Sequence, residues 1–341
     1  MDAYISGTVM YLSSVDGIMT DRTILIRREG THGIPVEEYA AAIRERRPDD
    51  DVILARTRSE ELDLIEDADV VAGLTFDEEL LERASSMQLF AGLAAGYEHL
   101  PLEEIAERGA VVTNASGVHG PNMAEQVLGN LLVFARRLDE GWRRQQDRHW
   151  EHYQAGELKG STVTVVGLGA IGQDIVQRLE PFEVGTIGAR YTPEKGGPTD
   201  EIVGLKGAEF EDAISRTDYL VLACPLTETT EGLIDADVFE TLPPSAVLVN
   251  VARGRVVETD ALLNALRGNE LGGAALDVTD PEPLPEGHPL WNFENVQITP
   301  HMAGCTPHYY ERCADILSRN LETVDKTGEY RDLENQVAGP K

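Results

Sequence analysis

The amino-acid sequence predicts an α/β protein with two domains, each built on a parallel sheet. A length of 341 residues suits two domains of roughly 150 residues each. Hydrophobic residues make up 42% of the chain, which is enough to form buried cores and too many for a disordered chain. Short apolar runs of strand length alternate with amphipathic helical stretches, the pattern of parallel strands joined by crossover helices. These three observations define the fold class before any motif is considered.

The first alternating series occupies the N-terminal part of the chain. The runs that we expect to form strands are Ile24–Ile26, Val52–Leu54, Val70–Ala72, Leu89–Gly92 and Val111–Val112. The stretches that we expect to form helices are Val36–Arg47, Glu60–Asp67, Asp77–Ala84 and Leu102–Arg108. The segment Asn122–Arg144, which carries Leu, Val and Ala on one side, then predicts a single long helix.

A second alternating series follows this helix. Its strand-like runs are Thr162–Val166, Tyr219–Ala223, Ala246–Val251, Ala274–Leu276 and Val296–Thr299. A last helix, about Pro307–Thr327, comes too late to belong to this series, and we expect it to return to the first domain. The expected division is a first domain of residues 1–118 completed by 312–341, and a second domain of residues 119–311.

The charge of the chain is strongly negative. Sixty acidic residues against 29 basic ones leave a net charge of −31, which excludes nucleic acid as a partner. Only five of the basic residues are lysines: Lys159, Lys195, Lys206, Lys326 and Lys341. An anionic surface with few lysines is typical of cytoplasmic proteins of halophilic archaea, because molar salt shortens the Debye length to about 3 Å and screens the repulsion. An acidic protein of a mesophile is the alternative.

The cysteines and the N-terminus indicate a cellular location. Three cysteines (Cys224, Cys305 and Cys313) are too few for a disulfide framework, which favours a reducing compartment. The N-terminus has no basic region followed by an apolar one, and no apolar run reaches the ~18–20 residues that a membrane helix needs. We therefore expect a soluble, cytoplasmic protein without a membrane partner.

A glycine-rich segment predicts a dinucleotide site. The sequence Gly167-Leu168-Gly169-Ala170-Ile171-Gly172 follows the strand-like run Val163–Val166 and opens a helical pattern that reaches Glu180. In this context the first glycine permits a tight turn, the second lets a pyrophosphate approach the backbone, and the third packs the helix on the strand. The amide groups at the start of the helix would then bind the phosphates. Glycines that merely shape a turn are the alternative.

The next strand indicates which dinucleotide is preferred. An acidic residue that would bind the ribose hydroxyls of NAD is expected at its end, but Ala189 is followed there by Arg190, Tyr191 and Thr192, with Lys195 nearby. An arginine at this position suits the 2′-phosphate of NADP. We expect NADP(H) to be preferred and NAD(H) to be accepted as well; the alternative is an ordinary surface arginine.

Ionisable residues follow three later strand-like runs, at the edge where open α/β sheets bind ligands. They are Arg253 after Asn250–Ala252, Asp277 after Leu276, and His301 after Pro300, and Glu282 lies in the loop between the last two. A histidine titrating near neutral pH can donate a proton to a carbonyl oxygen and take it back. A carboxylate can stabilise its imidazolium form, and an arginine can bind a substrate carboxylate through its planar fork.

The chain here resembles the D-isomer-specific 2-hydroxyacid dehydrogenase family. The matching segments, which span the whole second domain in order, are the glycine loop, Cys224–Thr227, Asn250–Gly254, Leu276–Val278, Glu282-Pro283 and Thr299–Gly304. The resemblance implies two Rossmann-like or flavodoxin-like domains with the active site in the cleft between them. It also implies NAD(P)-dependent reduction of small 2-keto acids to D-2-hydroxy acids, and a homodimer that uses the helix expected at Asn122–Arg144.

The resemblance assigns roles to particular residues. His301 would be the general acid/base, Glu282 its carboxylate partner, Arg253 the substrate-binding arginine, and Asp277 the acceptor for the nicotinamide carboxamide. The substrate would be bound by Ala95, Gly96, Arg253 and His301. The cofactor would be bound by Gly167, Leu168, Gly169, Ala170, Ile171, Gly172, Ala189, Arg190, Tyr191, Thr192, Cys224, Pro225, Thr230, Val251, Ala252, Arg253, Asp277, His301 and Gly304. The sequence departs from the family pattern at Glu98-His99-Leu100, where Asp-Asn-Ile/Val is usual.

A second Thr-Pro-His string competes with the first. His308 ends Thr306-Pro307-His308 seven residues after His301, but Pro307 there is typical of the first position of a helix. We therefore prefer His301, which follows a strand-like run. No metal-binding motif is present, and Cys224 is expected to be a small apolar residue beside the adenine rather than a nucleophile.

Other functions on the same residues stay open. A formate dehydrogenase is disfavoured by Glu282, since glutamine is usual there, and phosphite oxidation is a further alternative. A dinucleotide-sensing co-repressor would keep the whole site and act by binding partners, but the acidic surface and the loop at Arg190 disfavour it.

Overall fold

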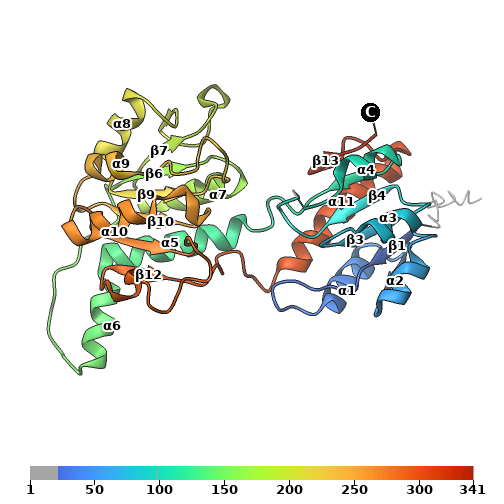
Figure 1. The fold of residues 1–341 in the computed structure, drawn as a ribbon, viewed down its shortest axis with the longest axis horizontal. Helices are drawn as coiled ribbons and strands as arrows, with labels where there is room; N and C mark the ends of the chain where they lie inside the picture. Colours follow the sequence, from blue (N-terminus) through green and yellow to red (C-terminus); the bar gives the residue numbers. More distant parts are fainter. Residues whose placement is uncertain (1–21, 98, 341) are drawn as a thin grey trace, which may run out of the picture. The chain divides into compact units, whose positions relative to one another are not determined.

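The computed structural model describes residues 22–97 and 99–340, which form two compact units. One unit consists of residues 22–115 and 310–340, and the other is Ser116–Tyr309. Each contains one sheet with helices packed on it (Figure 1). The predicted boundaries lay after residues 118 and 311, a few residues later in each case.

The sheet of the first unit has six strands in the order β13-β5-β4-β3-β1-β2. Five strands are parallel, whereas β13 pairs with β5 in the antiparallel direction. The strands are β1 (Thr23–Ile26), β2 (Asp51–Leu54), β3 (Val70–Gly73), β4 (Leu89–Gly92), β5 (Val111–Thr113) and β13 (Gln336–Ala338). Strand β13 lies in a segment without a strand-like pattern and comes after all of the second unit in the chain. It completes the sheet of the first unit by pairing with β5.

The helices of the first unit are α1 (Val36–Arg46), α2 (Arg58–Leu64), α3 (Glu78–Arg83), α4 (Leu102–Glu107) and α11 (Tyr309–Thr327). Side-chain oxygens fix two of their starts: Thr57 accepts the amide of Glu60 at 3.2 Å, and Asp77 accepts that of Leu80 at 3.0 Å. The buried strand residues Leu25, Val71 and Phe90 form one core with residues of α2, α3 and α4. Helices α1 and α11 contact each other through the rings of Tyr39 and Tyr310, whose centroids are 5.4 Å apart.

The sheet of the second unit is parallel and has seven strands in the order β12-β11-β10-β9-β6-β7-β8. The strands are β6 (Thr162–Val166), β7 (Gly185–Ala189), β8 (Glu201–Val203), β9 (Tyr219–Leu222), β10 (Val247–Asn250), β11 (Gly273–Leu276) and β12 (Val296–Ile298). The direction of the strand order reverses between β6 and β9, which is the place where sheets of this kind bind dinucleotides. Strand β8 was not among the strands predicted from the sequence.

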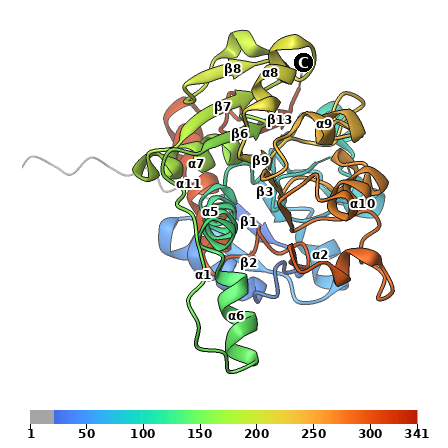
Figure 2. The ribbon, with the colours of Figure 1, turned by 90° about the vertical axis from the view of Figure 1, so that its left-hand side faces the viewer.

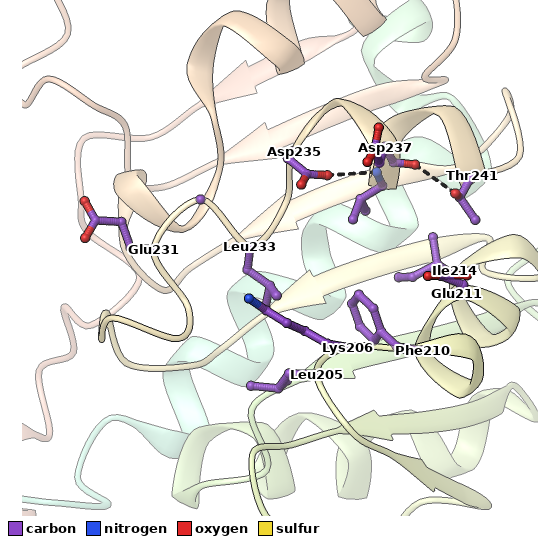
Figure 3. Close-up of a pocket in the computed structure, with 13 residues that line it drawn as sticks. Leu205, Lys206, Phe210, Glu211, Ile214, Glu231, Leu233, Asp235, Asp237 and Thr241 are labelled. Carbon is purple, nitrogen blue, oxygen red and sulfur yellow. Dashed lines mark hydrogen bonds between the residues drawn. The ribbon is translucent and has the colours of Figure 1, made fainter.

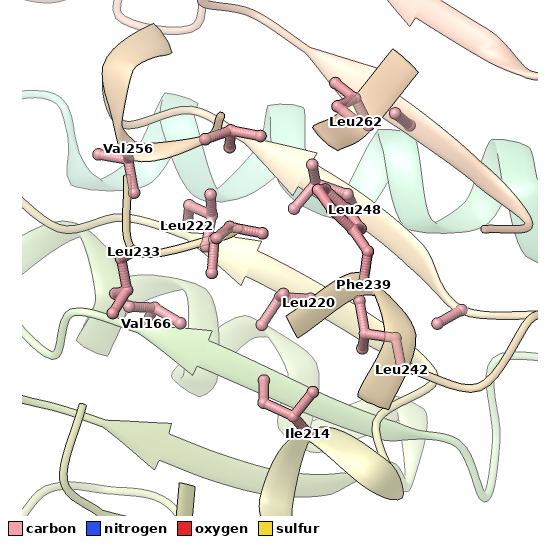
Figure 4. Packing of buried hydrophobic residues seen from close by; sticks show 14 of the residues in the cluster. Val166, Ile214, Leu220, Leu222, Leu233, Phe239, Leu242, Leu248, Val256 and Leu262 are labelled. Atoms are coloured by element: carbon pink, nitrogen blue, oxygen red, sulfur yellow. The ribbon is translucent and has the colours of Figure 1, made fainter. Parts of the chain in front are cut away.

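Helices cover both faces of this sheet. They are α5 (Gly120–Arg136), α6 (Leu138–Gln146), α7 (Ala170–Leu179), α8 (Ala208–Ser215), α9 (Ala236–Thr241) and α10 (Thr259–Gly268). Residues of α5 and α7 pack against one face. Residues of α8, α9 and α10 pack against the other, where Leu220, Leu222 and Leu248 of the strands contact Phe239 and Leu262 (Figure 4).

The single helix expected at Asn122–Arg144 is wrong. The chain forms α5 and α6 instead, because Arg137 between them adopts a left-handed backbone conformation with φ 49° and ψ 45°. Helix α5 buries Met123, Val127 and Leu131 against its unit, whereas α6 has no buried residue. Helix α6 therefore extends away from the body of its unit (Figures 1 and 2).

Across residues 22–97 and 99–340, no helix combines the length and the apolar composition needed to cross a membrane.

Candidate active site and cofactor cavity

The glycine loop forms the turn between β6 and α7. Gly167 has φ +97°, and a Cβ atom there would lie 2.7 Å from the backbone of Cys224, so only glycine fits. A Cβ atom on Gly172 would lie 1.9 Å from the carbonyl oxygen of Gly167, so this glycine lets the helix pack closely on the loop. Around Gly169, by contrast, no atom of the described chain lies within 4 Å of the Cβ position.

The start of α7 therefore fits a dinucleotide pyrophosphate. Gly169 is the residue before the helix, and no side chain caps the helix amides there. Uncapped amides at a helix start favour anionic groups, and the open space above Gly169 lets such a group approach. The three glycines, for which different roles are predicted, therefore differ in their surroundings. Gly167 lies against the backbone of Cys224, Gly172 lies against Gly167, and Gly169 has open space beside it.

A cavity of about 450 Å³ opens beside this loop. Its lining residues are Gly167, Leu168, Gly169, Arg190, Tyr191, Thr192, Lys195, Leu205, Cys224, Pro225, Thr227, Thr229 and Thr230. The Thr230 hydroxyl donates to the carbonyl of Pro225 at 2.6 Å and accepts the amide of Thr227 at 2.8 Å, which shapes the turn after β9. Burial raises the pKa of the Cys224 thiol to about 11, so this side chain is neutral and not a nucleophile.

The charge of this cavity comes from arginine and lysine. Among its described lining residues Arg190 and Lys195 are basic and none is acidic. Arg190 directly follows β7, its backbone amide donates to the carbonyl of Val203 at 3.1 Å, and its guanidinium donates to the carbonyl of Gly196. The guanidinium is therefore held at the edge of the cavity.

A neighbouring cavity of about 480 Å³ shares the residue Leu205 with the first (Figure 3). Its lining includes the carboxylates of Glu211, Glu231, Asp235 and Asp237. Asp235 accepts the amide of Val238 at 3.0 Å and so caps α9. Four carboxylates against the single lysine Lys206 disfavour a phosphate group here, whereas the lining of the cavity beside the glycine loop suits the cofactor.

A histidine and a carboxylate form a pair beyond the ends of β11 and β12. His301 Nδ1 lies 2.9 Å from Glu282 Oε2, and the other oxygen of Glu282 accepts the amide of Thr279 at 2.9 Å. Because a carboxylate only accepts hydrogen bonds, Nδ1 carries the hydrogen in this pair. Because Nδ1 is taken by Glu282, Nε2 is the ring nitrogen available for a hydrogen bond with a substrate. The His301 side chain is 52% exposed.

The loop that carries His301 is held by Asp277. This residue directly follows β11 and is 3% exposed. Its carboxylate accepts the Thr299 hydroxyl at 2.5 Å and the amides of Met302 and Ala303 at 3.0 and 2.9 Å. The His301 amide donates to the backbone carbonyl of Asp277 at 2.8 Å. Sequence analysis had missed this positioning role, and the expectation that Asp277 binds the carboxamide stays a prediction.

Arg253 follows β10 and is exposed. The buried Asn250 accepts the amide of Ala252 at 3.0 Å and donates to the carbonyl of Arg253 at 3.1 Å, which fixes this turn. A Cβ atom on Gly254 would lie 2.0 Å from the carbonyl oxygen of Thr279, so the loop of Arg253 abuts the loop that leads to Glu282. Sequence analysis had missed the roles of Asn250 and Gly254.

The structure also locates the remaining predicted residues. Ala95 and Gly96 are exposed in the loop after β4 of the first unit, where the Asn114 side chain donates to the carbonyl of Ala95 at 2.6 Å. Glu98, part of the departure from the family pattern, lies outside the described residues. His308 is exposed just before α11, and Gly304 accepts a hydrogen bond from the His119 ring at 3.0 Å. The second unit thus brings together His301, Glu282, Arg253 and Asp277.

Fold and site together define a class of protein. The glycine loop lies at the reversal point of a parallel sheet, and a histidine–carboxylate pair and an exposed arginine follow later strands at the same edge. These features define an NAD(P)-dependent oxidoreductase that handles a proton and an anionic substrate.

Comparison with known proteins identifies the family. Residues 128–303 match the model of the NAD-binding domain of D-isomer specific 2-hydroxyacid dehydrogenases. The chain is 34% identical over 280 residues to a glyoxylate reductase of Thermofilum pendens, covering 79% of this chain and 82% of that one. It is 35% identical over 262 residues to a human glyoxylate reductase/hydroxypyruvate reductase, covering 74% of this chain and 78% of that one.

A solved structure supports the same family assignment. The crystal structure of an NADPH-dependent glyoxylate/hydroxypyruvate reductase from Sinorhizobium meliloti is similar with a TM-score of 0.70 and 28% identity, over 93% of this chain and 98% of that one. The chain belongs to the D-isomer specific 2-hydroxyacid dehydrogenase family. The predicted fold class of two α/β domains with parallel sheets and the predicted NAD(P)-dependent reduction of small keto acids are confirmed.

Proposed function

We propose that the protein reduces glyoxylate and hydroxypyruvate to the corresponding hydroxy acids, prefers NADPH to NADH, and uses His301 as the general acid. The observation that carries the proposal is the pair of His301 Nδ1 and Glu282 Oε2 at 2.9 Å, in the same unit as the exposed Arg253 and the glycine loop. The relatives named as glyoxylate or hydroxypyruvate reductases support the choice of substrates.

The chemistry of the residues follows from this arrangement. A reduced nicotinamide bound in the cavity beside the glycine loop would supply the hydride for the carbonyl carbon of the keto acid. His301 donates the proton from Nε2 to the carbonyl oxygen, while Glu282 stabilises the imidazolium at Nδ1. Arg253 binds the substrate carboxylate by charge-assisted hydrogen bonds and polarises the carbonyl group. The resemblance also implies that Ala95 and Gly96 bind the substrate through backbone amides, and this role stays a prediction.

A panel of 2-keto acids with both cofactors tests the activity. We expect glyoxylate and hydroxypyruvate to be reduced in molar KCl, with formate and phosphite giving no reduction of NAD or NADP. Tight binding of NADPH without turnover of any keto acid would contradict the proposal and would favour a binding protein instead.

The NADPH preference rests on the cavity beside the glycine loop. A carboxylate would repel the 2′-phosphate of NADPH, but the described lining contains none and contains Arg190 and Lys195. A hydrogen bond to a charged group contributes roughly 1.5–3 kcal/mol, which is about one to two decades of preference, and salt reduces it.

The substitution Arg190→Asp should abolish or reverse the ratio of kcat/KM for NADPH to that for NADH, measured at one salt concentration. The matched control is Arg108→Asp, the same change of charge at an exposed arginine of the other unit. A wild-type enzyme that prefers NADH would contradict the preference.

We also propose a homodimer that uses α5, α6 and the segment after α6. Trp142 on α6 is 55% exposed and Trp150 in the following segment is 99% exposed, although tryptophan is typical of buried interface cores. The double substitution Trp142→Ser and Trp150→Ser should shift the mass measured by light scattering from dimer to monomer. Trp291→Ser is the control, because Trp291 is 49% exposed outside these segments. A monomeric wild type would contradict this proposal.

Finally, we infer a cytoplasmic location from the three cysteines and the reductive chemistry of the family. Cell fractionation with an antibody against the protein tests it, and recovery in a membrane or extracellular fraction would contradict it.

A further inference from the structure

The loop that carries His301 is held by two separate parts of the second unit. Asp277, after β11, accepts the amides of Met302 and Ala303. The start of α5 provides the other contacts, because its side chains donate hydrogen bonds to carbonyl groups of the same loop. These side chains lie at least 181 residues before the loop in the chain, and no role was assigned to them from the sequence.

The first of these side chains belongs to Asn122, in the first turn of α5. Its amide nitrogen donates to the carbonyl of Ala303 at 2.6 Å and to that of Cys305 at 3.5 Å. An asparagine amide group carries two hydrogens, so a single side chain can bind both carbonyls. Asn122 is half-buried, which protects the shorter of the two hydrogen bonds from solvent.

The second side chain belongs to His119, which directly precedes α5. Its Nδ1 donates to the carbonyl of Gly304 at 3.0 Å, since a carbonyl oxygen only accepts. The imidazole ring stacks on the buried ring of Tyr309, with the centroids 5.2 Å apart and an interplanar angle of 28°. A Cβ atom on Gly304 would lie 3.3 Å from Nδ1, so the glycine lets the ring approach the backbone. The stacked tyrosine therefore fixes the orientation in which His119 binds the loop.

These contacts leave the backbone of residues 301–305 little freedom to shift. Asp277 binds two of its amides, the amide of Cys305 donates to the carbonyl of Met302 at 2.8 Å, and α5 binds the carbonyls that follow. His301 is the first residue of this segment, so the position of its ring depends on both sets of contacts. A displacement of about 1 Å at a reacting group can lower a rate by about 10²-fold.

We propose that Asn122 and His119 are positioning residues for the reaction, which hold the loop so that the His301 ring keeps the orientation needed for proton donation. They act through the backbone of Ala303 and Gly304 and do not have to touch the substrate. This role rests on the proposed function, in which His301 is the general acid.

The substitution Asn122→Leu tests the first contact, because leucine has a similar size and no donor. We expect kcat with glyoxylate to fall by about 10- to 100-fold. The KM for glyoxylate should stay within about threefold of the wild-type value, since Arg253 is on a different loop. The matched control is Asn295→Leu, which should keep the wild-type kcat. Asn295 also donates to a backbone carbonyl, that of Gly272 at 3.2 Å, but it precedes β12, whereas His301 follows it.

A pair of variants tests the second contact. The amide nitrogen of asparagine is bonded to Cγ, as Nδ1 of histidine is, so His119→Asn keeps a donor near the carbonyl of Gly304. His119→Leu removes the donor, and both variants lose the stacking on Tyr309. We expect His119→Leu to have a lower kcat than His119→Asn. Thermal melting of every variant checks that it is folded.

Measuring Asn122→Leu in the His301→Asn background separates this role from the proposed function. A residue that acts through His301 should change kcat in that background by less than about twofold. The same loss of kcat in both backgrounds, or wild-type kcat in Asn122→Leu and His119→Leu, would overturn the positioning role. Wild-type kcat in His301→Asn alone would instead contradict the proposed function itself.

Discussion

At His301 the backbone enters the left-handed region, with φ 50°, which few non-glycine residues adopt, although histidine is enriched among those that do. The Asp277 carboxylate holds this conformation by accepting the amides of the two following residues and the hydroxyl of Thr299. The buried carboxylate of Asp277, which follows the neighbouring strand β11, therefore fixes the orientation of the loop that carries the His301 ring. Such positioning fixes Nε2 before any substrate binds.

The first prediction separates the two Thr-Pro-His strings. His301→Asn should lower kcat by about 10²–10⁴-fold, because proton donation by a placed histidine contributes about that much. His308→Asn should leave kcat unchanged within twofold, since His308 lies next to the start of α11 and it is His301 that pairs with Glu282. Steady-state kinetics of both variants check this, and a larger loss at position 308 would contradict the assignment.

The second prediction concerns the carboxylate partner. In Glu282→Gln the imidazolium of His301 loses the negative charge at Oε2 that stabilises it. Reduction needs the protonated ring, and the high-pH limb of kcat/KM should therefore move to lower pH. Glu286→Gln, an exposed glutamate of the same loop, is the control and should keep the wild-type profile. A profile unchanged in Glu282→Gln would remove this residue from the mechanism.

The sequence could predict the chemical groups of the site but not the residues that hold them. His301, Glu282 and Arg253 are recognisable by type and by their place after strand-like runs. Asn250 and Gly254 act through contacts with backbone atoms that only the folded chain brings close. The same holds for Asp277, whose three hydrogen-bond donors lie at least 22 residues away along the chain.

At the scale of elements, the strands marked by an apolar run were predictable, and the two strands without such a run, β8 and β13, were not. Strand β6 has the predicted bounds, because five residues with β-branched side chains mark it. Strands β8 and β13 have three residues each, and only their pairing with β7 and β5 defines them. The break at Arg137 was missed for a related reason, since the amphipathic pattern continues through both α5 and α6.

The third prediction concerns the attachment of α11 to the first unit. Asp325 on this helix pairs with Arg22 and Arg47 at 2.7 Å each. Burial alone would raise the pKa of Asp325, but the hydrogen bonds from Arg22 and Arg47 outweigh it and lower the pKa below 3.8. A lowered pKa means that the ionised carboxylate stabilises the fold above about pH 4, and that this contribution is lost as the pH falls through the folded-state pKa.

Asp325→Asn should therefore reduce the free energy of unfolding by about 1 kcal/mol at pH 7, a value limited by exposure to solvent. The difference from the wild type should disappear at a pH well below 3.8, where the carboxylate is protonated in the folded state as well. Denaturant unfolding at both pH values measures it, with Glu322→Gln as the control on the same helix. A difference that persists at low pH would show that the effect is not electrostatic.

At the scale of the whole molecule, the net charge of −31 sets the response to salt. The fourth prediction is that activity and Tm both rise as KCl increases towards molar concentrations, because the salt screens repulsion among the carboxylates. Sucrose at matched osmolality is the control, since it adds no screening. A protein equally stable in dilute buffer and in molar KCl would contradict the halophilic origin that the composition indicates.

The divided first unit has a consequence for how the chain acquires its structure during synthesis. Residues of Ser116–Tyr309 leave the ribosome as one uninterrupted segment, so the second unit can fold as soon as it has emerged. The first unit has to wait, because α11 and β13 are translated only after all of the second unit. Until then β5 exposes an unpaired edge, and an unpaired strand edge is a template for association with other chains. The nascent protein therefore passes through a stage in which its cofactor-binding half is structured while its other half depends on protection from aggregation.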